Sequence, residues 1–357
     1  MIFTFIHYSF VYFGDAIISI VHQMIIFGAP VLAVKWFEDS KRVIAISFAV
    51  TIAYLGTGES YGLNTYIIES FRDMKYSQKL SLIALFIIKA IFCLIICSIA
   101  YFTFKSKPQK PPSEAATAHR DDDILGTIRL LYANRQFMLL TSTHILYMTS
   151  FEIMRKNWRK MLSNQNYTNN EITDFELIRI LSGIAGSIVL GILLHCIKLY
   201  KTTNIWLGFL SLVGWILIPF VFKMDTTSIS ILYGYIGFSN YPINPFWYIY
   251  SVEVAYPLKE TTVVGIVRAI AVVISNSIAY LCLYFITRYP NDETMIIISS
   301  IMAFCSFLGI IWAMIIKPMN YETVKGENAS KFILILIFIE SESFSSSRKL
   351  RTIKSII

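Results

Sequence analysis

Three of the charged side chains inside the long apolar runs of this sequence are the first candidates for chemistry. They are Glu59, Lys89 and Glu152. A charge in the hydrocarbon core of a bilayer is costly unless it is paired or faces water. Each residue is therefore a candidate to line a solute pathway. The structural alternatives are a satisfied polar contact for Glu59, within GTGESYG, and a pair with Glu59 for Lys89.

Glu152 shares its predicted helix face with a second polar residue. His144 precedes it by about two helical turns, so both side chains point the same way. A carboxylate here could attract an organic cation or take up a proton. The alternative is an ion pair with Arg155 or Lys156, which follow at helical i, i+3 and i, i+4 spacing.

Other kinds of chemistry lack their sequence patterns. The cysteines all fall within or at the ends of apolar runs and form no metal-ligand pattern with nearby histidines, which indicates packing thiols. They are Cys93, Cys97, Cys196, Cys282 and Cys305. There is no GxxxxGK[ST] loop and no GxSxG elbow. We therefore expect no catalytic residues, no metal and no cofactor, and hence no enzyme.

The elements that position these residues follow from composition. The 357 residues are 55% hydrophobic and 15% charged, against about 45–50% and about 25% in soluble domains. A spanning helix needs about 20 largely apolar residues. Nine stretches qualify: roughly 14–34, 43–67, 80–104, 137–154, 177–198, 203–222, 228–250, 262–286 and 294–316. The sequence predicts an all-α polytopic membrane protein whose partner is the lipid bilayer.

A polar stretch divides the chain. Residues 105–136 are rich in proline and charge and predict a cytoplasmic linker, helical around 124–131. This gives a partial N-terminal helical half (1–104), the linker, a C-terminal six-helix half (137–316) and a cytoplasmic tail (317–357).

Basic residues give the orientation. The net charge of +8 collects in short loops and in the linker, as the positive-inside rule expects for cytoplasmic segments, and not in a nucleic-acid-binding stripe. The sequon at Asn166 then lies on the outer face, as a candidate glycosylation site. The plasma membrane is the default location, with an organelle membrane as the alternative, and a monomer is the default state.

Four stretches of the sequence resemble one transporter family, in the same order and spacing. They are MIIFGAPVLAVKWFEDSKRV (24–43), NRQFMLL (134–140), AGSIVLGILLHCIKLYKTTN (185–204) and GFSNYPINPFWYIYSVEVAYPLKETTVVG (237–265). They are similar to the feline leukaemia virus subgroup C receptor-related transporters of the major facilitator superfamily. The resemblance implies a major facilitator fold in which the first run here matches the fourth helix, so that three helices are absent.

The same resemblance locates site residues. Glu152 falls where the family has a cage tyrosine for a choline-like solute, and Tyr54 where it has a glutamine. Glu253 and Glu260 match acidic positions that imply an inner gate with Arg268, which replaces a small polar residue. The further pathway candidates are His144, Tyr147 and Trp247. Haem, the family's other solute class, would favour His22, His144 or His195 as ligands.

We therefore expect a transporter of a small organic solute, either a choline- or ethanolamine-like cation or haem, working by alternating access. One alternative is a truncated, non-transporting membrane receptor or partner protein. Another is a major facilitator that carries a sugar or an organic anion. Arg179, Arg268 and Lys89 facing the cavity would favour an anion, whereas Glu152 with Tyr147, Trp247 and Tyr250 would favour a cation.

Overall fold

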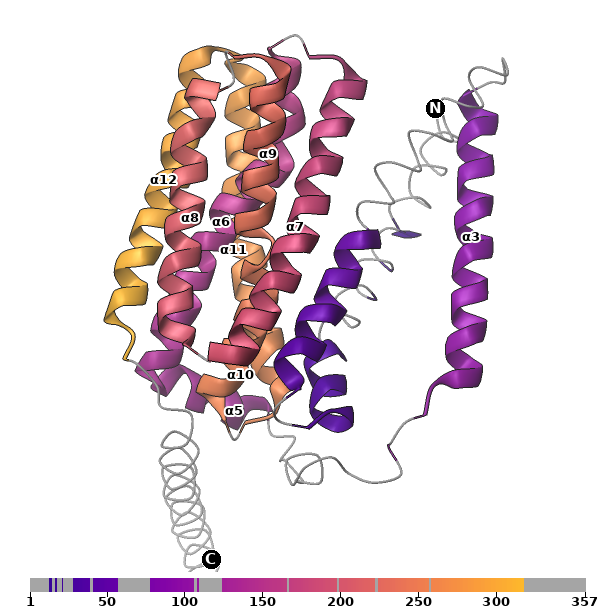
Figure 1. The fold of residues 1–357 in the computed structure, drawn as a ribbon, viewed down its shortest axis with the longest axis vertical. Coiled ribbons are helices and arrows are strands. Elements are labelled where there is room, and N and C mark those ends of the chain that lie inside the picture. Colours follow the sequence, from indigo (N-terminus) through magenta and orange to yellow (C-terminus); the bar gives the residue numbers. More distant parts are fainter. Residues whose placement is uncertain are drawn as a thin grey trace, which may run out of the picture.

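The fold is a bundle of long helices (Figure 1). The computed structural model describes residues 13–14, 17, 21, 28–38, 41–56, 78–105, 108, 124–165, 167–197, 199–221, 224–256 and 258–317. The helices are α3 (Gln78–Thr103), α5 (Ile124–Ala133), α6 (Arg135–Ser163), α7 (Asn169–Ile197), α8 (Tyr200–Val221), α9 (Thr226–Asn240), α10 (Ile243–Ala255), α11 (Glu260–Arg288) and α12 (Asp292–Ile315). Residues 28–36 and Arg42–Gly56 are also helical.

Five helices in the described part of the chain are long and apolar enough to cross a membrane. They are α3, α7, α8, α11 and α12. No strand occurs among the described residues. The predicted all-α, multi-pass membrane architecture is confirmed, whereas the division at residues 105–136 stays a prediction. The prediction of one helix over 228–250 was wrong, because that run contains two helices, α9 and α10.

Small polar side chains join the helices of the bundle. Thr149 of α6 contacts Ser275 of α11 at 3.3 Å between hydroxyl oxygens. Asn157 donates from Nδ2 to the carbonyl of Ala279, also on α11, at 3.2 Å. Ser150 donates to the carbonyl of Met302 on α12 at 2.9 Å. Such bonds hold membrane helices together where burial of apolar surface gives little driving force. Helix α6 is therefore bonded to both of the helices that it packs against most extensively.

Helix α3 packs less against the rest of the protein than the helices of the bundle do. It stands apart from the α6–α12 bundle in Figure 1, and of its described side chains only Leu85 is buried. The Arg42–Gly56 helix lies against the bundle instead, at the end that carries α5 and α10 (Figure 1). A helix that is apolar all round is stable where lipid or other helices cover it, which agrees with a membrane location for α3.

Two prolines separate α9 from α10. Pro242 has no N–H for the carbonyl of Phe238, and Pro245 has none for the carbonyl of Tyr241. The Tyr241 carbonyl accepts a hydrogen bond from the hydroxyl of Tyr54 at 3.1 Å and a longer one from the backbone N–H of Asn244 at 3.4 Å. A break in a membrane helix is tolerated where side chains satisfy the released backbone groups.

Glycines bring α7 against α9 close to this break. A Cβ added to Gly186 would collide with the backbone oxygen of Phe238, and one added to Gly237 would collide with the backbone oxygen of Arg179. Small residues at helix crossings permit such close approach in membranes. The two glycines therefore fix how near α7 lies to the end of α9.

We expect Gly237→Ala to lower the stability of the bundle by about 2 kcal/mol, because the new methyl group meets backbone that cannot rotate away. Thermal unfolding of the protein in detergent measures this. Gly234→Ala, one turn earlier on α9, is the control: its Cβ would have its nearest neighbour at 3.6 Å, and alanine favours helix by up to about 1 kcal/mol. Equal melting temperatures for both variants would contradict the packing argument.

Candidate functional site

The break between α9 and α10 faces side chains from α6, α11 and the Arg42–Gly56 helix. We call this group the break site. Its members are Tyr54, His144, Met148, Tyr241, Asn244, Trp247 and Arg268. Discontinuous helices in membrane transporters commonly build solute sites near the bilayer midplane.

Arg268 supplies the positive charge of the break site. Its Nη1 lies 3.4 Å from Oδ1 of Asn244 on α10 and 3.8 Å from the sulfur of Met148 on α6. Its buried Nε has no hydrogen-bond partner among the described residues. The guanidinium is thus held by two weak contacts and keeps donors available for an acceptor. The predicted gating role with Glu253 and Glu260 stays a prediction; the former lies in the last turn of α10 and the latter in the first turn of α11.

His144 and Trp247 form the aromatic wall of the site. Their ring centroids are 4.7 Å apart at an interplanar angle of 34°. Both residues are buried, and neither the His144 nitrogens nor Trp247 Nε1 has a hydrogen-bond partner among the described residues. A buried polar group left unpaired costs about 1–3 kcal/mol, so these atoms are available to a solute or to water.

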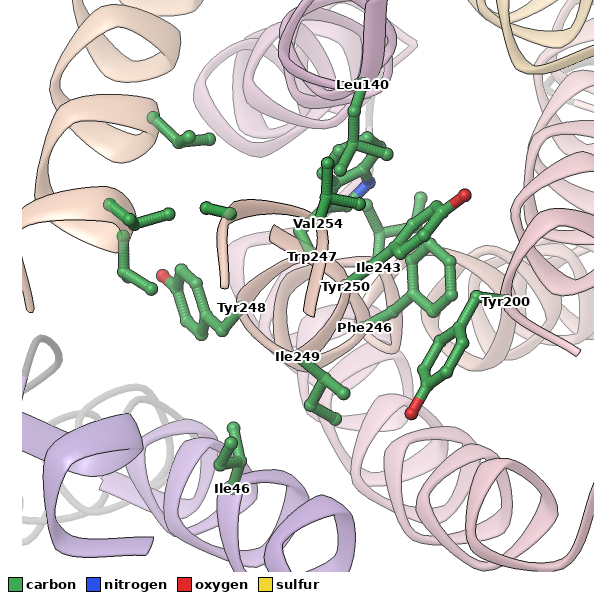
Figure 2. Packing of buried hydrophobic residues seen from close by; sticks show 14 of the residues in the cluster. Ile46, Leu140, Tyr200, Ile243, Phe246, Trp247, Tyr248, Ile249, Tyr250 and Val254 are labelled. Atoms are coloured by element: carbon green, nitrogen blue, oxygen red, sulfur yellow. The ribbon is translucent and has the colours of Figure 1, made fainter. Parts of the chain in front are cut away.

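The rest of α10 packs among buried hydrophobic side chains, several of which are labelled in Figure 2. Phe246 and Tyr250 lie on the side of α10 that faces Tyr200, and the rings of Tyr200 and Tyr250 stack at 5.4 Å. Ile249 and Ile46 belong to the same buried cluster, which includes residues of the Arg42–Gly56 helix. This packing fixes the helix that presents Asn244 and Trp247.

Glu152 is paired within α6. Its Oε2 accepts from Nε of Arg155 at 2.9 Å and lies 2.7 Å from Nη2 of the same residue. The Glu152 side chain is 6% exposed and the Arg155 side chain 42%. Of the two roles left open by the sequence, the structure shows the ion pair, so the carboxylate is neutralised before any solute arrives.

Other predicted residues lie away from the break site. Tyr147 packs against Gly208 and Gly309, between α8 and α12, and its hydroxyl donates to the backbone oxygen of Asn204 at 3.3 Å. Lys89 is half-buried on the separate helix α3. Glu59, Asn166 and His22 lie outside the described residues. No group of three or more metal-binding side chains occurs among the described residues.

The structure also contains a buried ion pair that the sequence prediction missed. Arg179 on α7 donates from Nε to Oε2 of Glu176 at 2.9 Å and from Nη2 to Oε1. The two residues are 1% and 0% exposed. Their i, i+3 spacing was the available signal. Tyr241 and Asn244 were missed as well, although the NYPINP run (240–245) places two prolines three residues apart and thus marks the break.

Curated proteins of known or assigned function resemble this chain over most of its length. The choline/ethanolamine transporter flvcr2a of Danio rerio is 27% identical over 259 residues, which are 70% of this chain and 54% of that protein. The choline/ethanolamine transporter FLVCR2 of Homo sapiens is 27% identical over 256 residues, 69% of this chain and 48% of that protein.

An uncharacterized MFS-type transporter of Caenorhabditis elegans is 25% identical over 305 residues, 83% of this chain and 51% of that protein. No family model matches the chain. The chain spans about half the length of the curated relatives it matches. The predicted kinship with feline leukaemia virus subgroup C receptor-related transporters of the major facilitator superfamily is confirmed by these relatives.

The Glu152–Arg155 pair can be tested separately from transport. We expect Arg155→Gln to destabilise the protein by about 1 kcal/mol, because it leaves the buried Glu152 carboxylate unpaired. The effect is limited because the Arg155 side chain is partly exposed. Adding Glu152→Gln should restore the melting temperature measured in detergent. Lys41→Gln is the control: Lys41 and Glu38 are 3.5 Å apart but 65% and 61% exposed, so no change is expected. An unchanged melting temperature in Arg155→Gln, combined with lost uptake in Glu152→Gln, would instead indicate that Glu152 serves a solute.

Proposed function

We propose that this chain, a relative of the FLVCR-type major facilitator transporters, carries a small organic solute across a membrane by alternating access. The observation that supports this most is the break site. Aromatic rings, an amide and a guanidinium gather where a membrane helix is interrupted. Alternating access moves two helical halves about such a fixed site.

The first solute class to test is a small amine alcohol. The relatives in Danio rerio and Homo sapiens are named choline/ethanolamine transporters. Trp247 offers an aromatic ring, which attracts an ammonium group by cation–π interaction. The charge of Arg268 opposes such a solute, and the Glu152 carboxylate that could offset it is paired with Arg155.

The second solute class is an organic anion, and Arg268 favours it. This guanidinium has an unpaired buried donor within the described part of the site, beside the donors of His144 and Trp247. A carboxylate or a phosphate could accept from Arg268 directly, with charge-assisted hydrogen bonds. The two classes therefore differ in the sign of the effect that Arg268 has on binding.

Arg268→Gln separates the two classes. A like charge about 10 Å away at an effective dielectric constant of about 20 costs about 1.7 kcal/mol, so we expect its removal to lower the KM for choline or ethanolamine by about 15- to 20-fold. If the solute is an anion, the same change should abolish saturable uptake. The measurement is uptake of radiolabelled choline, ethanolamine and a panel of carboxylates into cells that express the protein from its native transcript.

Arg288→Gln is the matched control for this experiment, because Arg288 is exposed in the last turn of the same helix. Its uptake should equal that of the unaltered protein. Uptake of no tested solute by a well-expressed protein would contradict the transport proposal and favour a receptor or partner role.

A further inference from the structure

The Arg42–Gly56 helix meets the bundle along a contact zone that begins near its first turn. Val43, Ile46 and Val50 are buried in one cluster with residues of α7 and α10. A Cβ added to Gly191 of α7 would lie 2.7 Å from the Cβ of Ser47. Under the proposed function, this helix and the bundle belong to the two halves that move. The contact zone must therefore open and close in each cycle.

The contact zone ends at a polar contact. The Tyr54 hydroxyl donates to the Tyr241 carbonyl at 3.1 Å, and the two rings meet edge to face with centroids 4.5 Å apart. Pro245 deprives that carbonyl of its helical partner. The N–H of Asn244 also donates to it, at the longer distance of 3.4 Å, and a membrane offers no water to replace a lost donor. The hydrogen bond from Tyr54 is thus favourable only while the two parts are together.

The Tyr241 ring is held from its other sides. The Arg179 guanidinium lies 5.1 Å from its centroid and 5.8 Å from the centroid of Phe151. A Cβ on Gly183 would lie 2.5 Å from Cγ of Tyr241. Two hydrogen bonds to Glu176 hold the Arg179 guanidinium in this position. Arg179 is neutralised by Glu176 and 1% exposed, its guanidinium lies against the Tyr241 ring, and its Nη1 has no hydrogen-bond partner among the described residues.

We propose that the Tyr54–Tyr241 contact is a latch between the two halves, and that Arg179, held by Glu176, is its positioning residue. This inference rests on the proposed function, since the latch matters only if the halves separate. The latch favours the state in which the contact zone is closed. Its strength depends on how firmly Arg179 and Gly183 hold the Tyr241 ring in reach of Tyr54.

Tyr54→Phe tests the latch, because it removes the hydroxyl and keeps the ring. The reporter is Val50→Cys, a change of similar volume within the contact zone, in a background without other reactive cysteines. We expect maleimide to label Cys at position 50 about fivefold faster in Tyr54→Phe, since the loss of one hydrogen bond between the halves raises the open population by about that factor. An unchanged labelling rate would overturn the latch.

Tyr235→Phe is the matched control. The Tyr235 hydroxyl also donates to a backbone carbonyl, that of Leu210, at 2.8 Å, but both residues belong to the bundle. Its removal should leave the labelling rate unchanged. A similar increase in both variants would show that loss of any tyrosine hydrogen bond loosens the fold, which would overturn the assignment.

The positioning role requires two further variants. Arg179→Lys keeps the charge and loses the bidentate hydrogen bond to Glu176. Gly183→Ala displaces the Tyr241 ring and leaves the ion pair in place. Each should raise the labelling rate alone, and neither should raise it further when added to Tyr54→Phe. Additive effects would overturn the positioning role. If Arg179→Lys does not fold, Gly183→Ala answers the same question.

The labelling assay needs no solute, so it tests the latch independently of the transport proposal. Faster labelling of Tyr54→Phe with no uptake of any solute would overturn transport and keep the latch. Saturable uptake with an unchanged labelling rate would keep transport and overturn the latch.

Discussion

The rest of the described bundle depends on one constraint: a membrane helix that is interrupted must still satisfy its backbone. The prolines at positions 242 and 245 leave the carbonyls of Phe238 and Tyr241 without their usual donors. No water replaces those donors in a bilayer. The Tyr54 hydroxyl and the N–H of Asn244 donate to the Tyr241 carbonyl, and Gly186 of α7 lies close to the Phe238 carbonyl. The position of the break thereby determines which side chains meet around it.

The close approach of α7 has its own physical requirement. Backbone can lie against backbone only where side chains are absent, as at Gly186 and Gly237 at the α7–α9 crossing, and Gly183 leaves room nearby for the ring of Tyr241. The same crossing carries the Glu176–Arg179 pair, whose burial is tolerable because the charges neutralise each other and Tyr241 and Phe151 cover the guanidinium. The glycines and the ion pair thus hold α7 close to the break between α9 and α10.

The fold was far more predictable from the sequence than the site was. Long apolar runs indicate membrane helices directly, so α3, α8, α11 and α12 were predicted within about three residues at each end, whereas α7 begins at Asn169, ahead of the predicted 177. Side-chain direction is a different matter. Glu152 could have faced a cavity or Arg155, and Tyr147 proved to fill the space left by Gly208 and Gly309. Only packing decides such questions, because one helix offers several faces to different neighbours.

The unpaired polar atoms of His144 and Trp247 favour any rearrangement of the break site that brings water or a polar solute to them. With the contact zone closed, these buried atoms have no partner among the described residues, and Nε of Arg268 is in the same condition. Each costs about 1–3 kcal/mol relative to a hydrogen-bonded state. Any arrangement that admits water or a polar solute to them recovers part of that cost. The tight packing of α10 and the contact with Tyr54 act in the opposite sense. These two effects oppose each other on the same helices, and a membrane helix bundle that moves requires states whose free energies differ by only a few kcal/mol.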